Sequence, residues 1–133
     1  MPELDDSSVN VARGSDLDLV DQTAGMDRLK AFDTDETMVF RLEIDGDETS
    51  DWHHHGDHHV FGYLVEGRGR WEYGSSEEDT VTVDAGDFWH IPPRTIHRDI
   101  NPYDEPQTAI VFIYGSGPLA VDVAGPDADV VLE

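Results

Sequence analysis

The clearest pattern in this chain is an alternation of apolar and polar residues that begins at residue 37. Every second residue from Met38 to Ile44 is large and apolar, which predicts a β-strand because successive side chains of a strand point to opposite faces. Similar short runs, separated by Gly, Pro, Asn, Asp or Ser, follow at 60–66, 70–73, 80–83, 88–91, 95–100, 108–114 and 119–123. Many short strands joined by turn residues are typical of an all-β sandwich or barrel.

The first third of the chain is less regular. Residues 1–16 are polar and acidic without any period, so we expect a loose N-terminal arm. Residues 17–32 suit either an early strand or one short helical turn. A length of 133 residues favours one domain, which we place over residues 17–133.

The net charge of −22, from 30 acidic and 8 basic residues, disfavours nucleic acid and anionic membranes as partners. The acidic residues are dispersed between apolar positions, which suggests a protein adapted to high salt; a merely acidic mesophilic protein is the alternative. No run of apolar residues is long enough for a membrane helix, and we expect a cytoplasmic location. The chain has no cysteine, so any metal ligands must be His, Asp or Glu.

All seven histidines lie between residues 53 and 97, and five of them lie within residues 53–59. On a strand, His53 and His55 point the same way, and a histidine from a neighbouring strand can complete a metal site with them. Neutral imidazole binds Fe, Mn, Ni, Cu or Zn. A solvated loop rich in histidine is the simpler alternative.

The second half of this histidine region resembles the cupin superfamily, one of whose motifs is G-x5-PxG-x2-H-x3-N. Gly86, Pro92, His97 and Asn101 keep the spacing of this motif, and the one departure is Arg94 at a glycine position. The resemblance implies that His97 is a metal ligand and that Asn101 closes the turn after it. An arginine at position 94 is costly in any turn that needs a positive φ.

The other cupin motif, G-x5-HxH-x3,4-E-x6-G, matches less well. The His53–His55 pair is present, but Gly46 stands one residue too far ahead of it and the glutamate is missing. The position of that glutamate falls on His59 or Val60. We favour His59 as the substitute ligand, which requires a bulge at residues 56–59 to aim it inward.

Two neighbours are less favoured substitutes for the glutamate, first His58 and then Asp57. Without any substitute, the site would have three histidines and open positions for water or substrate. Further candidates for lining a ligand pocket are His58, Tyr63, Phe88, His90 and Arg94. For His90 a place in the core or at its rim is the simpler interpretation, and for Arg94 a solvated turn.

The resemblance covers about residues 37–123 and implies a small single-domain cupin of the type-2 kind. Its fold would be a single antiparallel β-barrel, also described as a double-stranded β-helix or jelly roll. The expected metal set is His53, His55, His59 and His97, holding one divalent ion of Fe, Mn, Zn or Ni near the mouth of the barrel. A homodimer formed through outer strands is also implied.

Fold alone does not fix chemistry, so three functions stay open. The first is a metal-dependent enzyme acting on a small molecule, with oxygenase-type chemistry on a diol, thiol or enol compound. The second is a metal-dependent isomerase or lyase without redox change. The third is a non-catalytic cupin that binds or senses a small molecule.

Overall fold

The computed structural model describes residues 4–23, 25–74, 79–128 and 130, and these form twelve β-strands without a helix. The all-β prediction is therefore confirmed. The strands are β1 (Asp18–Thr23), β2 (Met26–Asp33), β3 (Thr37–Ile44), β4 (Glu48–Thr49), β5 (His53–His54), β6 (His59–Glu66), β7 (Arg68–Tyr73), β8 (Asp79–Asp84), β9 (Phe88–Ile91), β10 (His97–Asn101), β11 (Gln107–Tyr114) and β12 (Val121–Asp122).

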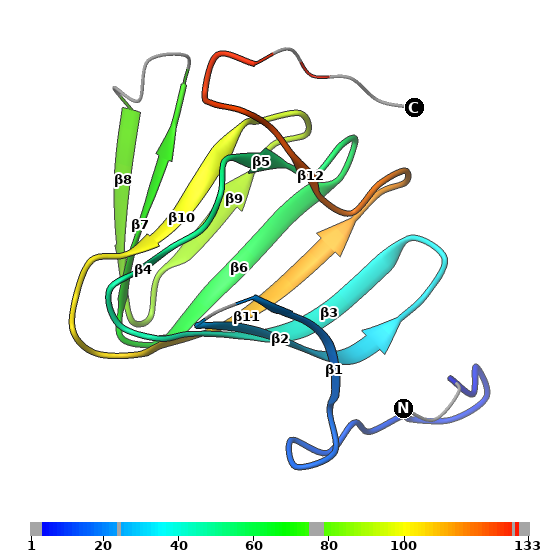
Figure 1. The fold of residues 1–133 in the computed structure, drawn as a ribbon. Coiled ribbons are helices and arrows are strands. Elements are labelled where there is room, and N and C mark those ends of the chain that lie inside the picture. The colour runs from blue at the N-terminus through cyan, green and yellow to red at the C-terminus, as the bar shows by residue number, and fades with distance from the viewer. Residues whose placement is uncertain (1–3, 24, 75–78, 129, 131–133) are drawn as a thin grey trace.

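The strands form two antiparallel sheets, which lie beside each other in Figure 1. The first sheet has the order β1-β2-β3-β11-β6-β9. The second has the order β12-β5-β10-β7-β8, with β4 paired to β10. The ambiguous segment 17–32 is resolved as strand, because β1 pairs with β2 and β2 pairs with β3.

Alternation along the strands builds a core between the sheets. In β3, Phe40, Leu42 and Ile44 are buried, as the sequence pattern predicts. They pack in one cluster with residues of the second sheet such as Trp71 and Val83. The inward face of each sheet is thus the face that carries its apolar residues.

The two antiparallel sheets do not close into a barrel. Among the described residues no hydrogen-bonded ladder joins the two sheets. The strand β9 is an edge strand of the first sheet, and β8 is an edge strand of the second. Trp71 of β7 and Trp89 of β9 are in contact at this seam, with ring centroids 4.5 Å apart and planes tilted by 36°. Trp71 belongs to the buried core and Trp89 packs against it, so both rings lie between the two sheets.

Two further observations concern the N-terminal segment and the question of membrane-spanning helices. Residues 4–17 contain no strand, and the division into an arm over 1–16 and a domain over 17–133 stays a prediction. Within the described residues there is no helix with the length and hydropathy to cross a membrane.

Candidate metal centre

Three histidines come together where β5, a strand of two residues, lies between β10 and β12. His53 pairs directly with His97 of β10, and His55 follows β5 on the same face as His53. The ring centroids are 4.4 Å apart for His53 and His97 and 5.0 Å apart for each of the other two pairs. One potential ligand atom from each ring lies within 4.8 Å of the other two.

Backbone carbonyls set the tautomer of all three rings. Nδ1 of His53 donates to the carbonyl of Asp51 at 2.7 Å, and Nδ1 of His97 donates to the carbonyl of Thr95 at 2.9 Å. Nδ1 of His55 donates to the carbonyl of Leu119, also at 2.7 Å. Because a carbonyl can only accept, each Nδ1 carries the hydrogen, and each neutral ring keeps its lone pair on Nε2.

The environment of the cluster keeps the rings of His55 and His97 neutral. Burial, together with the charges that His97 and His53 would carry, lowers the pKa of His55 to about 3. Burial also lowers the pKa of His97, although Asp99 opposes that shift. Both rings are therefore uncharged at neutral pH, which is the form that binds a metal.

The donor set fits a divalent metal ion. Nε2 of His53 and Nε2 of His97 are buried and have no hydrogen-bond partner among the described residues. Buried polar atoms are rarely left without a partner, and three lone pairs facing one point repel one another unless a cation lies between them. Nitrogen ligands oriented through Nδ1 by carbonyls are the usual arrangement at protein metal sites.

A carboxylate that we did not predict lies beside these histidines. Asp99 follows His97 by two residues on β10, so strand alternation places both on one face. Its oxygens are 3.8 Å from Nε2 of His53 and 3.8 Å from Nε2 of His97. Burial alone would raise the pKa of Asp99, but the three imidazoles and Arg28 lower it below its usual range.

The structure places His59 apart from the three clustered histidines. His59 begins β6, where side chains alternate between the core and the outer face. Its neighbour Val60 points into the core, so His59 points outward and its Nδ1 lies 3.0 Å from Nε2 of His90. The turn at residues 55–58, with Gly56 at φ 59°, ends before His59 and does not redirect it inward.

The other two histidines of the run contact the protein itself. His54 is fully buried on the opposite face, and its Nδ1 accepts the backbone N–H of Gly56 at 3.0 Å. Nδ1 of His58 donates to the carbonyl of His55 at 2.8 Å. Both rings therefore hold the turn that follows β5.

The remaining candidate pocket residues have separate places. The ring of Tyr63 packs on the ring of Phe88 at 4.6 Å, on the outer face of the first sheet. Arg94 has φ 61°, so the non-glycine residue does occupy a turn that needs a positive φ. Its Nε donates to Asp57 at 2.8 Å and its backbone N–H to the carbonyl of Gly56 at 2.8 Å, which ties together the two histidine segments.

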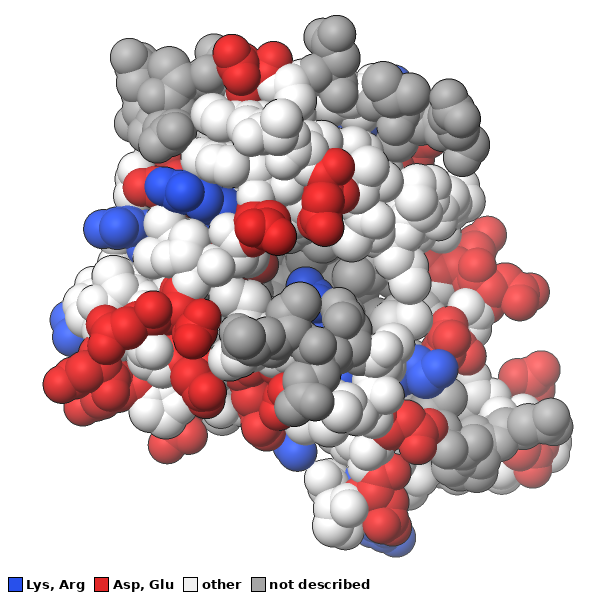
Figure 2. All heavy atoms as spheres, viewed as in Figure 1, with Lys and Arg blue, Asp and Glu red and all other residues white. Residues whose placement is uncertain are grey.

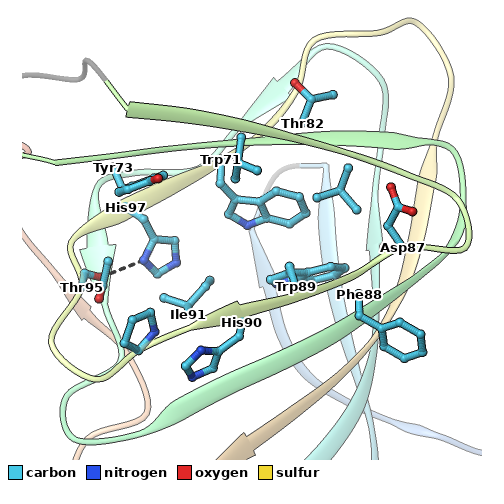
Figure 3. A pocket seen from close by; sticks show the side chains of 13 residues that line it. Trp71, Tyr73, Thr82, Asp87, Phe88, Trp89, His90, Ile91, Thr95 and His97 are labelled. Carbon is cyan, nitrogen blue, oxygen red and sulfur yellow. Dashed lines mark hydrogen bonds between the residues drawn. The ribbon is translucent and has the colours of Figure 1, made fainter.

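A cavity of about 700 Å³ opens at the seam between the sheets and reaches His97. Figure 3 shows the indoles of Trp71 and Trp89 at the same cavity as the imidazole of His97. Phe88 and His90 also line it, as the sequence suggested, whereas His58, Tyr63 and Arg94 do not belong to its lining. A smaller cavity of about 30 Å³ lies on the inner side, bounded in part by His55, His97 and Asp99.

Comparisons with known proteins agree on the fold. A family model described as a cupin domain matches residues 40–114. Similar solved structures include KdgF from Halomonas sp. (TM-score 0.67, 19% identity, 82% of this chain and 96% of that chain) and an RmlC-like cupin from Shewanella frigidimarina NCIMB 400 (0.68, 20%, 82% and 93%). Oxalate decarboxylase from Bacillus subtilis is similar over 77% of this chain and 28% of that one (TM-score 0.66, 18% identity). No curated protein sequence matches.

Proposed function

The chain belongs to the cupin domain family, and on this premise we propose that it is a metal-dependent enzyme acting on a small molecule. The observation that carries the proposal is the meeting of three buried imidazoles, one of which, His97, also lines a cavity of about 700 Å³. His53, His55 and His97 would hold one divalent ion of Fe, Mn, Zn or Ni. When bound, such an ion supplies Lewis acidity and open coordination positions.

The residues of the chain have two roles in the proposed site: some orient the imidazoles, and others line the cavity. The carbonyls of Asp51, Thr95 and Leu119 hold the three rings with their lone pairs inward. The rings of Trp71 and Trp89, tilted by 36° to each other, form part of an apolar wall that would shield a substrate from water. A substrate in the cavity would therefore meet the metal beside His97.

The lining of the cavity favours a neutral substrate with an apolar or aromatic portion. Aromatic and aliphatic side chains dominate, and the described residues at its wall include Asp87 but no Lys or Arg. By its name, the Bacillus subtilis neighbour acts on oxalate, a small dianion. A cavity of about 700 Å³ without a cation at its wall is a poor match for such an anion, so we propose a larger, uncharged compound.

Oxygenase-type chemistry on a diol, thiol or enol compound is the reaction we propose first. A lyase is the second candidate, since one structural neighbour is a decarboxylase by name. Oxygen uptake separates the two, because a lyase turns over its substrate at the same rate without oxygen. A bound compound recovered unchanged after long incubation with the metal-loaded protein would contradict both and leave a binding or sensor role.

Elemental analysis of protein purified without a nickel column tests the metal site directly. We expect about one divalent ion per chain, lost in His53→Ala and His97→Ala and kept in the matched control His59→Ala. Circular dichroism establishes that each variant is folded. Full metal content in a folded His97→Ala protein would contradict the proposal.

We further propose that the chain forms a homodimer through the outer face of the first sheet. Phe61, Phe112 and Tyr114 are 45%, 42% and 49% exposed there, and Phe112 pairs directly with Phe61 in the ladder between β6 and β11. Neighbouring exposed aromatic residues of this kind form a contiguous apolar patch, which is typical of interaction surfaces, whereas singly scattered apolar residues are not. Sedimentation should give a dimer that Phe61→Glu dissociates, and a monomeric wild-type protein would refute the proposal.

We also propose that the protein is adapted to a salt-rich cytoplasm. The formal net charge is −22, and Figure 2 shows Asp and Glu side chains spread over the viewed face. Screening by salt relieves repulsion between such charges. The melting temperature should therefore rise from low to molar salt, and a constant value would end this interpretation.

A further inference from the structure

The carboxylate of Asp99 faces the three histidines from the inner cavity, which Arg28 also lines. Asp99 is 8% exposed, and Ser50 fixes its backbone from both sides. Oγ of Ser50 accepts the Asp99 N–H at 2.8 Å, and the Ser50 N–H donates to the Asp99 carbonyl at 2.8 Å. The side chain is thereby held toward the clustered imidazoles.

The side-chain atoms of His53, His97 and Asp99 that face one another are all hydrogen-bond acceptors. The Nε2 atoms of His53 and His97 carry lone pairs, because their hydrogens are on Nδ1. An ionised carboxylate accepts only, and its 3.8 Å distances to these nitrogens are too long for hydrogen bonds. Buried acceptors gathered in this way are stable when a cation binds among them.

The distances also suit a shared ion. Donor atoms at about 2.1 Å from one metal lie roughly 3.0 to 4.2 Å from one another, depending on the angle between them. The separations of 3.8 Å from Oδ2 to Nε2 of His53 and from Oδ1 to Nε2 of His97 fall within this range, so each carboxylate oxygen lies at a suitable distance from one ring. Asp99 lies outside the compact group of three imidazoles, so binding would draw its carboxylate slightly toward His55.

The opposite wall of the same small cavity lacks the expected carboxylate. Val60 is one of the two positions, with His59, on which the spacing of the first motif places a glutamate, and it is 4% exposed in the core. Val60, His55, His97 and Asp99 all line the inner cavity of about 30 Å³. The wall formed by β6 has therefore Val60 and no carboxylate, whereas β10 provides the carboxylate of Asp99.

We propose that Asp99 is the fourth protein ligand of the metal, in place of the glutamate missing from the first motif. This inference rests on the proposed metal site of the three histidines. The donor set is then three imidazoles and one carboxylate, which suits Fe(II) and Mn(II). It carries one negative charge, so the site retains a net charge of about +1 with a divalent ion.

Titration of the metal-free protein with Mn(II) and with Co(II) tests this ligand. Asp99→Asn should raise the Mn(II) dissociation constant on the order of 100-fold, since even indirect partners of a metal contribute 10- to 100-fold. It should also shift the visible absorption of the Co(II) form. The matched control Asp104→Asn, which removes an exposed carboxylate from the next turn, should change neither quantity.

A structural role for Asp99 as a partner of Arg28, whose charge acts on it, predicts the reverse result. Asp99→Asn would then destabilise the metal-free protein in urea and leave Mn(II) affinity and the Co(II) spectrum unchanged, which would overturn the inference. His97→Ala separates this failure from that of the metal site itself. If wild type binds Mn(II) and His97→Ala does not, while Asp99→Asn binds normally, only the role of Asp99 is refuted.

Discussion

Acidification of the metal-free protein should reveal the buried, neutral state of His55. Its pKa is about 3 in the fold, against an ordinary value of 6.5. Between these values the unfolded chain binds a proton that the folded chain does not, so the free energy of unfolding falls as the pH falls. The slope is about 1.4 kcal/mol per pH unit, which makes about 3 kcal/mol between pH 6.5 and pH 4.5 from this one ring.

The high negative charge of the protein acts in the opposite direction. Protonation of carboxylates at low pH reduces repulsion within a chain of net charge −22, so the total stability does not report on His55 alone. The difference in unfolding free energy between wild type and His55→Gln reports on His55, because the carboxylates are common to both proteins. His97, whose pKa is also lowered by burial, contributes with the same sign and is likewise present in both.

Urea denaturation with a chelator, at several pH values from 7 to 4.5, provides the measurement. We expect wild type to lose about 3 kcal/mol more than His55→Gln over this range. His90→Gln, which removes an exposed imidazole, is the matched control and should parallel wild type. Parallel curves for wild type and His55→Gln would refute the reasoning, because they would mean that His55 titrates alike in the folded and unfolded chains.

Three further substitutions test the scaffold of the site, each by urea denaturation. Asn101→Ala should lower the unfolding free energy by about 2 to 3 kcal/mol, because its buried amide donates to two carbonyls, at 3.1 and 2.7 Å; no loss would mean that water replaces the amide. A Cβ at Gly62 would overlap the Trp89 ring, so Gly62→Ala should lower the unfolding free energy by about 1 to 3 kcal/mol. In the control Gly125→Ala the new Cβ has its nearest contact at 3.7 Å, and the loss should be under about 1 kcal/mol. Arg94→Gly removes the strain of a positive φ but also an exposed ion pair, so we expect a change within about 1 kcal/mol, and a larger loss would show that the ion pair matters more than its exposure suggests.

Local spacing explains why much of the fold was predictable. The alternation in 37–44 and 108–114 predicts strands that the structure contains as β3 and β11. The second motif depends on short-range geometry: Gly86 has φ 97°, and Asn101 closes the turn at residues 101–105 through its own side chain. The gathering of His53, His55 and His97 follows from alternation together with the spacing of the two motifs.

What the sequence did not reveal depends on pairing between distant strands. The strands β4 and β5 have two residues each, too few for any period, and exist because β10 pairs with them. The place of His59 depends on where β6 begins, and a shift of one residue would reverse its face. Alternation alone places Asp99 on the face of His97, since it lies two residues later on β10, but neither of the two motifs has a carboxylate at that position.

In the proposed site, the open edge between β8 and β9 would separate the part that recognises a ligand from the part that holds the metal. The wall of the large cavity comes from β7, β8 and β9, while the imidazoles come from β5 and β10 and from the residue after β5. Substitutions at positions such as Val81 or Thr82 can therefore reshape the binding space without moving the metal ligands. If the proposed function holds, selection or design could change the specificity of this chain by altering one side of the opening while the histidines stay in place.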